Sequence, residues 1–412
     1  MVDPLFTSSR HIPKPPTSRY RVPNLSRTAL RGPCGRGLHK SGAKVRRGAG
    51  GVGSSGVTAV SGPDADGERR IVSDAAGVVV LGTCAAWSLI TAAAHDGRPE
   101  GVLLAVLAVA AGYAAGRISG ALLPVGAPLA GALAGIALTV AVPHLAPGPQ
   151  IAAPLGHAGG TAAVLTLSAG AACCAAWSAP VPAVRFALRV LAAGTAVLAA
   201  VLGSTTGLVT CLAVLVCSLA AGRTRHRGAG MALLAAVAAL VTGLVWAVAA
   251  QAVPGGFLAA LEGRLTPHRV RLWQDAWHLL GDDAALGAGP GRFGELSTTS
   301  AQSLLSDGKP HSAPLQQAAE QGVVGVVLLA AAFCWVLYAL WRGPRPTPVA
   351  LTAGAALTAL AAIAAIGNAL SFTAVSVGAG LLAGMATARP LDPSSRTTPE
   401  AQARGAGRTP AW

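Results

Sequence analysis

The sequence predicts an all-α membrane protein with about ten transmembrane helices and one large extracytoplasmic loop between spans seven and eight. Of its 412 residues, 52% are apolar and only 11% are charged, whereas soluble domains carry about 25% charged residues. Apolar runs of about 20 residues, the length that a membrane-crossing helix needs, recur along the chain. Lys and Arg gather in the N-terminal region and on alternate connections between these runs, as in a multi-pass protein of the cell membrane.

The two ends of the chain are predicted to be cytoplasmic tails. Residues 1–70 are basic, rich in Pro, Gly and Ser, and show little apolar periodicity. Such a composition cannot bury a core, so we expect this tail to be disordered. The alternative is a contact between the tail and anionic lipid headgroups. A second disordered tail is expected over 389–412.

Ten apolar runs are candidate spans, seven before the loop (75–250) and three after it (322–388). They lie at 75–94, 101–116, 121–142, 159–178, 186–203, 205–221, 230–250, 322–341, 349–366 and 369–387. Several are short and rich in Ala and Gly. Small residues four positions apart let helix backbones pack closely. Such pairs are Gly112/Gly116, Gly131/Gly135 and Gly380/Gly384.

The short connections predict the orientation of the helices. Basic residues fall after the second, fourth, sixth and eighth runs, at Arg117, Arg185, Arg189, Arg223, Arg225, Arg227, Arg342 and Arg345. The opposite connections are nearly free of Lys and Arg. Both termini are therefore expected in the cytoplasm and the loop 251–321 outside. The net charge of +15 follows this membrane pattern, so nucleic acid is not an expected partner.

The loop 251–321 is the only long polar interruption of the apolar region, and chemistry is expected there. Thr266 as N-cap and Pro267 at the first helical position predict a helix that runs to about Leu280. Its Trp273 and Trp277 suit a helix that lies at the lipid headgroups.

A glycine-rich turn follows this helix. The segment from Gly289 to Gly294 fits the G-x-G-x-x-G pattern, but it lacks the preceding strand that a dinucleotide site needs. We interpret it as a tight turn that brings backbone N–H groups, at Gly289 and Gly291, together with Arg292. These donors would lie against a phosphate or against the membrane domain.

His311 lies just ahead of a helix predicted over 314–321, and an imidazole near an acceptor hydroxyl can act as a general base. The same loop holds four arginines, a residue type that binds a diphosphate through bidentate hydrogen bonds. They are Arg264, Arg269, Arg271 and Arg292. No Cys/His spacing is typical of a metal site, and no cofactor is expected.

Three motifs in this order resemble the O-antigen ligase and O-antigen polymerase family. They read Arg269-x-x-Leu-Trp273, Gly287-x-Gly-x-Gly-x-Phe293 and His311-x-x-x-Leu-Gln-x-x-x-Glu320-x-Gly-x-x-Gly325. The resemblance covers roughly 200–345.

The resemblance implies a metal-independent inverting glycosyltransferase, either a ligase or a polymerase. It would move a glycan from undecaprenyl diphosphate to a hydroxyl of an acceptor glycan or lipid at the outer face of the bilayer. By that analogy Arg269 would hold the diphosphate and His311 would assist the acceptor. The remaining substrate-binding candidates are Arg264, Arg271, Arg292, Gly289, Gly291 and Glu320.

The chain departs from the family pattern at two positions. The family has Ser-Arg-Gly at the outer start of a middle helix, and Thr206 stands here where that Arg is expected. Arg264, Arg271 or Arg292 must then replace this diphosphate contact, or the chain is a diverged, inactive member. The family also has Asn after the His, and this chain has Ser312.

Two alternatives remain open. A peptidoglycan polymerase of the shape and division class would use the same type of lipid carrier, but it needs an acidic loop residue in a motif that this chain lacks. A non-catalytic polysaccharide transporter would be expected to carry ionisable residues at mid-membrane. The centres of the predicted spans contain no Asp, Glu, Lys or Arg.

Overall fold

The computed structural model describes residues 63–145, 154–253, 266–301 and 308–391, which all belong to one unit, Val60–Trp412. Within these ranges the regular structure is helical and no strand occurs, so the predicted all-α class is confirmed. Most of the two cytoplasmic tails, expected over 1–70 and 389–412, lies outside the described residues, as does Arg264.

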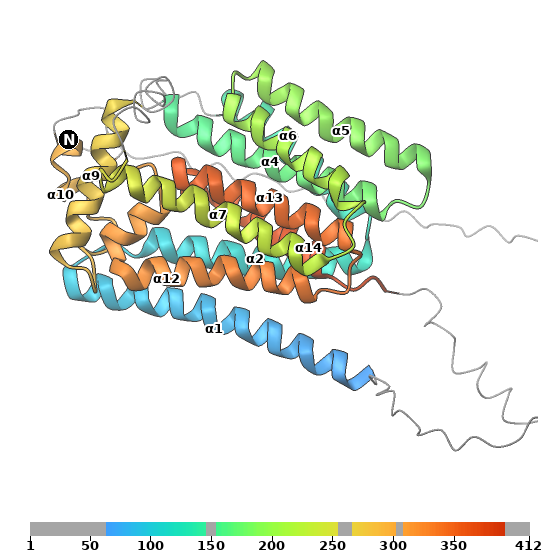
Figure 1. Ribbon diagram of the computed structural model, residues 1–412, viewed down its shortest axis with the longest axis horizontal. Helices are drawn as coiled ribbons and strands as arrows, with labels where there is room; N and C mark the ends of the chain where they lie inside the picture. The colour runs from blue at the N-terminus through green and yellow to red at the C-terminus, as the bar shows by residue number, and fades with distance from the viewer. Residues whose placement is uncertain (1–62, 146–153, 254–265, 302–307, 392–412) are drawn as a thin grey trace, which may run out of the picture. The chain divides into compact units, whose positions relative to one another are not determined.

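Long helices make up the body of this unit (Figure 1). Those before the loop are α1 (Pro63–His95), α2 (Glu100–Leu122), α3 (Gly126–Leu145), α4 (Pro154–Ser178), α5 (Pro182–Val201), α6 (Thr205–Ala221) and α7 (Arg227–Ala249). The loop contributes α9 (Pro267–Asp282), α10 (Phe293–Leu296) and α11 (Thr298–Ala301). After it come α12 (Ala313–Arg342), α13 (Thr347–Ile366), η1 (Ala369–Ser371) and α14 (Thr373–Thr387).

Seven described helices, α1, α2, α4, α5, α7, α12 and α13, are long and apolar enough to cross a membrane. The protein is therefore a multi-pass membrane protein. The helices α3, α6 and α14 are apolar but shorter. At 1.5 Å per residue, α14 spans only about 22 Å, less than the ~30 Å of a bilayer core. Ten crossings thus stay a prediction that depends on these three helices.

One predicted boundary was wrong and another was confirmed. Helix α1 begins at Pro63, so residues 63–70 are helical rather than part of a disordered tail. A proline at the first helical position and acidic residues in the first turn, Asp64 and Asp66, favour a helix start there. The boundary predicted between the helix over 314–321 and the eighth span is confirmed, since α12 is broken at Gly322 (φ 66°, ψ −166°).

Glycine pairs bring α2 and α14 together, as their spacing predicted. A Cβ on Gly384 would lie 3.0 Å from the Cα of Gly116, and one on Gly112 would lie 3.1 Å from the backbone N of Leu381. Larger side chains would push these backbones apart. Close packing of this kind is how small residues associate helices in lipid.

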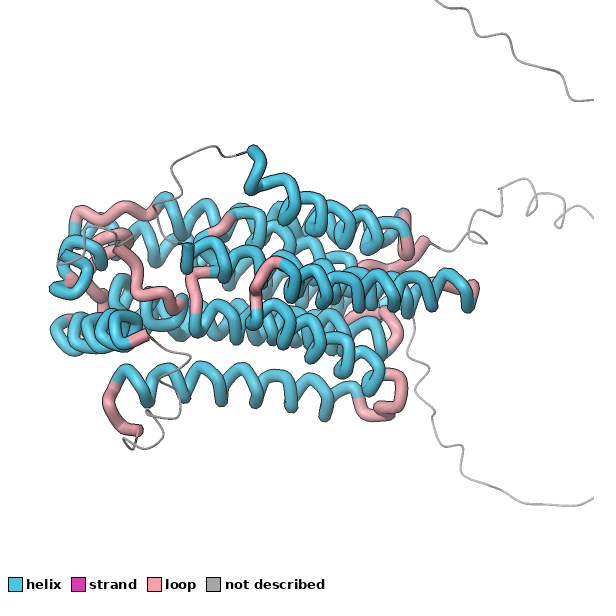
Figure 2. The backbone as a smooth tube through the Cα atoms, turned by 90° about the horizontal axis from the view of Figure 1, so that it is seen from above, coloured by secondary structure: helices cyan, strands magenta, loops and turns pink. Residues whose placement is uncertain are grey.

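The loops gather at the two ends of the helices (Figure 2). At one end, Arg227 donates from Nη1 to the Gly343 carbonyl at 3.0 Å, and Arg345 donates from Nη2 to the Gly120 carbonyl at 2.7 Å. At the opposite end lie α9 and α10 (Figure 1). The arginines predicted to be cytoplasmic thus lie away from the loop helices, while the side of the membrane that each end faces stays a prediction.

Candidate functional site

The glycine-rich turn docks onto the break in α12. A helix break leaves carbonyl groups without their usual partners four residues on, and buried carbonyls need replacements. The turn supplies two of them, because the Ala288 N–H donates to the Ala319 carbonyl (2.8 Å) and the Gly289 N–H to the Glu320 carbonyl (3.0 Å). In a third hydrogen bond the Val323 N–H of α12 donates to the Ala284 carbonyl (2.9 Å). Trp87 of α1 donates from Nε1 to the next carbonyl, that of Gln321, at 3.1 Å.

Glycine is required on both sides of this contact. Gly287 (φ 68°) and Gly322 (φ 66°) have left-handed backbones, which side chains with a Cβ disfavour. A Cβ on Gly287 would also lie 2.6 Å from the carbonyl carbon of Glu320. The first glycine of the motif therefore permits a backbone-to-backbone contact.

The connection between α1 and α2 packs against the same turn. Arg292 donates from Nη1 to the His95 carbonyl at 2.8 Å, and the Arg98 N–H donates to the Pro290 carbonyl at 2.7 Å. A Cβ on Gly289 would lie 2.7 Å from the Cβ of His95. The donors of Gly289 and Arg292 thus contact the membrane domain, and their binding to a phosphate stays a prediction.

Beside the docked turn lies a cavity of about 450 Å³, called here the polar chamber. Its walls come from the α1–α2 connection, the glycine-rich turn, the segment before α12, α12 itself and η1. Its polar lining includes Arg98, Glu100, Lys309, Gln316, Glu320 and Asn368. Charged, hydrogen-bonding and apolar groups therefore meet in one space at the loop end of the helices.

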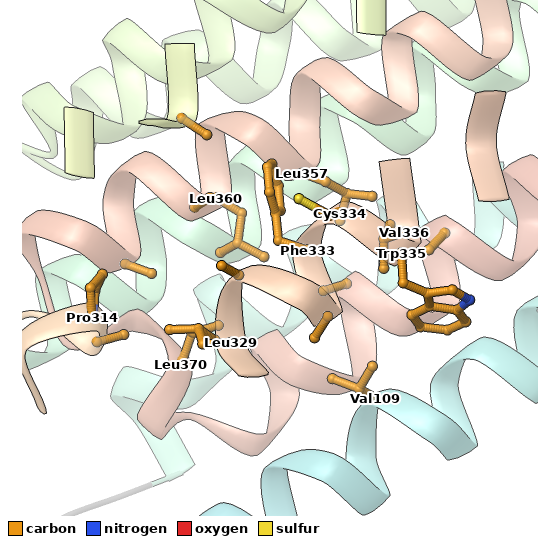
Figure 3. Close-up of a pocket in the computed structure, with 18 of the residues that line it drawn as sticks. Val109, Pro314, Leu329, Phe333, Cys334, Trp335, Val336, Leu357, Leu360 and Leu370 are labelled. Atoms are coloured by element: carbon orange, nitrogen blue, oxygen red, sulfur yellow. The ribbon is translucent and has the colours of Figure 1, made fainter. Parts of the chain in front are cut away.

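A second cavity, of about 360 Å³, adjoins the first and is called here the apolar chamber. Val109, Leu329, Phe333 and Leu360 are among its lining residues (Figure 3). The two chambers share six lining residues, Leu81, Val109, Ala313, Leu329, Ala332 and Leu370. Together they form a polar compartment that continues into an apolar one.

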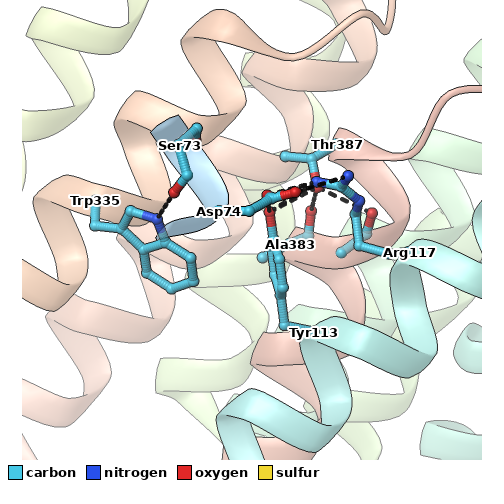
Figure 4. A network of polar contacts seen from close by, with 8 residues as sticks. Ser73, Asp74, Tyr113, Arg117, Trp335, Ala383 and Thr387 are labelled. Carbon is cyan, nitrogen blue, oxygen red and sulfur yellow. Dashed lines mark hydrogen bonds and ion pairs between the residues drawn. The ribbon is translucent and has the colours of Figure 1, made fainter. Parts of the chain in front are cut away.

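Two aromatic residues line the far part of the apolar chamber. The rings of Tyr113 and Trp335 lie 5.2 Å apart between centroids. Trp335 donates from Nε1 to the Ser73 carbonyl at 2.9 Å (Figure 4). Arg117 donates to the Tyr113 hydroxyl at 3.2 Å and pairs with Asp74 at 2.9 Å. This network ties α1, α2 and α12 together at the end away from the loop.

Arg269, predicted to hold the diphosphate, is half-buried near the chambers. It donates from Nη1 to the carbonyl of Ile366, the last residue of α13, at 3.2 Å. Burial lowers the pKa of Arg269, but a guanidinium stays charged in proteins. The negative end of the α13 dipole favours a cation there. Two residues beyond Ile366, Asn368 lines the polar chamber.

His311, the predicted base, lies in the segment that leads into α12. Its backbone is left-handed (φ 52°) and its side chain is partly exposed. Lys309, two residues before it, lines the polar chamber, and Ala313, two residues after it, lines both chambers. Neither lining includes His311 itself. The adjacent Ser312 is 1% exposed, and its Oγ has no hydrogen-bond partner in the described residues.

The other candidate residues divide into two groups. Gly291 and Glu320 line the polar chamber. Glu320 is 5% exposed, and its carboxylate accepts hydrogen bonds from Gln316 Nε2 (3.3 Å) and from the Gly291 N–H. Arg271 is exposed on α9, and Thr206 is exposed at the start of α6. Neither of these two lines a chamber.

The expectation for Trp273 was wrong. It is 1% exposed and packs in a core with Phe293 and Leu315, because this face of α9 lies against α12. Trp277 is 36% exposed and meets Trp246 edge to face, with 5.6 Å between ring centroids. Among the described residues, no group of three or more His, Cys, Asp or Glu could hold a metal ion.

Sequence reasoning missed Arg98 and Lys309. Both line the polar chamber, yet the first lies far from the loop in sequence and the second had no motif. Each carried a weak signal: Arg98 is an exception in a connection on the side nearly free of basic residues, and Lys309 is the only lysine beyond Lys44.

Residues 187–330 match the family model described as O-antigen ligase. Comparison with curated proteins and with solved structures found no match. The matched region includes α6, α7, α9, the docked turn and the first part of α12, and so contains all three motifs. It confirms the resemblance over these residues, so this multi-pass membrane protein is similar to the O-antigen ligase family in the region 187–330.

Proposed function

We propose that this protein is a glycosyltransferase that moves a glycan from undecaprenyl diphosphate to an acceptor hydroxyl at the outer face of the membrane. The observation that carries the proposal is the polar chamber that continues into the apolar chamber at the loop end of the helices. A lipid-linked glycan has a matching division, with a long apolar chain, an anionic diphosphate and a hydroxyl-rich sugar. The family match supports the same substrate class.

The proposed reaction is a single displacement with inversion. The acceptor oxygen attacks the anomeric carbon from the face opposite the diphosphate, and the new glycosidic bond forms as the bond to the diphosphate oxygen breaks. The electron pair of that bond leaves with the diphosphate, whose charge nearby cations stabilise. The acceptor proton passes to a general base. We assign the cation role to Arg269 and the base role to His311.

The assignment is consistent with where the two side chains lie. Arg269 is half-buried at the negative end of α13, next to the turn that carries Asn368 into the polar chamber. His311 is flanked by Lys309 and Ala313, which both line that chamber. A donor in the chamber would therefore have its reacting end near both residues.

The test is a transfer assay with purified full-length protein, an undecaprenyl diphosphate-linked glycan and a glycan or lipid acceptor, followed by mass spectrometry of the product. His311→Ala should lower the rate by about 10²–10⁴. Arg269→Ala should abolish transfer, and Arg269→Lys should restore part of it, because a point charge replaces a planar fork. Arg223→Ala, at an exposed arginine of the α6–α7 connection, is the control and should transfer normally.

Retained activity in Arg269→Ala or His311→Ala would remove that residue from the mechanism. Failure of the wild-type protein to form a glycosidic bond with any lipid-linked glycan would refute the proposal. Movement of the glycan across the membrane without bond formation would instead favour the transporter.

A further inference from the structure

Two cations from distant parts of the sequence line the polar chamber. No hydrogen bond or ion pair joins the side chain of Arg98 or of Lys309 to another residue in the described ranges. They come from the α1–α2 connection and from the segment before α12, which lie more than two hundred positions apart in the sequence.

The carboxylates of the chamber have stabilising partners, and Lys309 is one of those of Glu320. Glu320 accepts hydrogen bonds from Gln316 and from the Gly291 N–H. Glu100 is the first residue of α2, where the positive end of the helix dipole stabilises a negative charge. Lys309 favours the charged form of Glu320, while Arg98 is exposed beside the chamber. An anion that enters the chamber would meet both cations.

The backbone of Arg98 is fixed in place by the glycine-rich turn. Its N–H donates to the Pro290 carbonyl at 2.7 Å, and a Cβ on Gly97 would lie 2.8 Å from that carbonyl oxygen. A Cβ on Gly291 would come within 3.3 Å of the Arg98 carbonyl oxygen. This close packing fixes the Arg98 backbone beside the chamber before any ligand binds, so only the side chain has to be ordered on binding.

The residue at the position where the family has a cationic arginine is uncharged here and does not line either chamber. Thr206 is exposed at the start of α6. The segment after its N-cap, Ser204, packs on α4 instead, since a Cβ on Gly207 would lie 3.3 Å from the Cα of Ala162. Neither chamber includes Thr206 in its lining.

We propose that Arg98 and Lys309 hold the diphosphate of the lipid-linked donor in the polar chamber and so replace the arginine that is missing at position 206. This inference rests on the proposed function. The guanidinium can bind two phosphate oxygens as a planar fork, while the lysine ammonium acts as a flexible point charge. The apolar chamber then takes the first part of the polyprenyl chain.

The experiment measures lipid binding to the full-length protein in detergent by a scintillation proximity assay. The probes are tritiated undecaprenyl diphosphate and tritiated undecaprenol, which has the same chain and no phosphate. In the double variant Arg98→Gln/Lys309→Gln, the affinity for undecaprenyl diphosphate should fall at least about tenfold, since each lost contact is a charge-assisted hydrogen bond. Its affinity for undecaprenol should not change.

Two matched variants accompany it. Arg223→Gln/Arg225→Gln removes the same charge at exposed positions between α6 and α7 and should bind both lipids as the wild type does. The conservative exchange Arg98→Lys/Lys309→Arg should keep most of the preference for the diphosphate.

The outcomes separate the inference from the proposed function. If the wild type prefers undecaprenyl diphosphate and the Arg98→Gln/Lys309→Gln variant keeps that preference, the inference is overturned and the proposed function stands. If the affinity of the variant for undecaprenol falls as much as its affinity for undecaprenyl diphosphate, the two residues only support the fold, and the inference is again overturned. If the wild type itself shows no preference for the diphosphate, the proposed function fails as well.

Discussion

The docked glycine turn is a place where one added methyl group should have a large effect, and Gly287→Ala is the test. Its φ of 68° would place an alanine in the left-handed region, at a cost of about 1–2 kcal/mol. The new Cβ would lie 2.6 Å from the carbonyl carbon of Glu320 and from the N of Gly322. Backbone atoms cannot rotate away as side chains do, so the turn must separate from α12.

Separation would break the three hydrogen bonds between the turn and the break in α12. Each contributes about 0.5–1.5 kcal/mol, so with the backbone strain the docked state should lose about 3–6 kcal/mol. Hydrogen–deuterium exchange measures this directly, because the amides of Ala288, Gly289 and Val323 donate these bonds. Their protection should fall by about 10²–10⁴, while helix content and membrane insertion are retained.

Gly281→Ala is the matched control in the same loop. Nothing lies within 4 Å of a Cβ at Gly281, and alanine is favoured over glycine in a helix by about 0.5–1 kcal/mol. This variant should keep wild-type exchange over 284–291 and full transfer activity. If Gly287→Ala also kept wild-type protection there, the turn would not be docked as the structure has it. The claim that this glycine permits the contact would then be wrong.

Two further predictions concern topology and acid stability. A reporter fused after Gly308 should give an extracytoplasmic signal; a cytoplasmic signal would overturn the predicted orientation. Burial raises the pKa of Asp275, but hydrogen bonds from Ser297, Thr299 and Thr298 outweigh it and hold the pKa below its usual value. A depressed carboxyl pKa stabilises the fold above the unfolded pKa, near 4, and this contribution is lost as pH falls through the folded value. Thermal unfolding of Asp275→Asn should therefore depend less on pH below about 5, and an unchanged pH dependence would contradict this account.

Local hydrophobicity was sufficient to predict the helices. Each of the ten apolar runs lies within or overlaps a helix, and the sixth has the predicted bounds of α6. Long apolar runs predict helices reliably because, in lipid, the backbone N–H and C=O groups of a segment must hydrogen-bond to one another. The close packing of α2 on α14 was also predicted locally, from glycines four positions apart on each helix. The early start of α1 was missed because a basic, polar composition outweighed the start signal at Pro63.

The burial of α9 shows where local patterns become ambiguous. Trp273 on an amphipathic helix fits a lipid interface and a protein core equally well. The outcome depends on Phe293 and Leu315, which come from segments that follow α9 in the chain. Periodicity identifies the apolar face of a helix, but not the surface that covers it.

The polar chamber was beyond sequence reasoning for a related reason. Arg98 and Lys309 line one cavity because the α1–α2 connection packs on the glycine-rich turn and that turn packs on α12. Most of these hydrogen bonds join backbone groups, whose pairing cannot be predicted from residue periodicity. Arg98 was only an exception to the pattern of basic residues on alternate connections, and no sequence motif linked it to the loop 251–321.

The docked turn also changes how the family motifs are understood. The glycines suggested an anion-binding turn, yet the N–H groups of Ala288 and Gly289 donate to the carbonyls that the break at Gly322 leaves unpaired. The second and third motifs are thus one structural unit, in which each segment satisfies the other's backbone. That unit fixes Glu320 in one wall of the polar chamber and, through Pro290, Arg98 in another. A motif glycine can therefore be essential for transfer without touching the substrate, because the positions of the groups that do so depend on it.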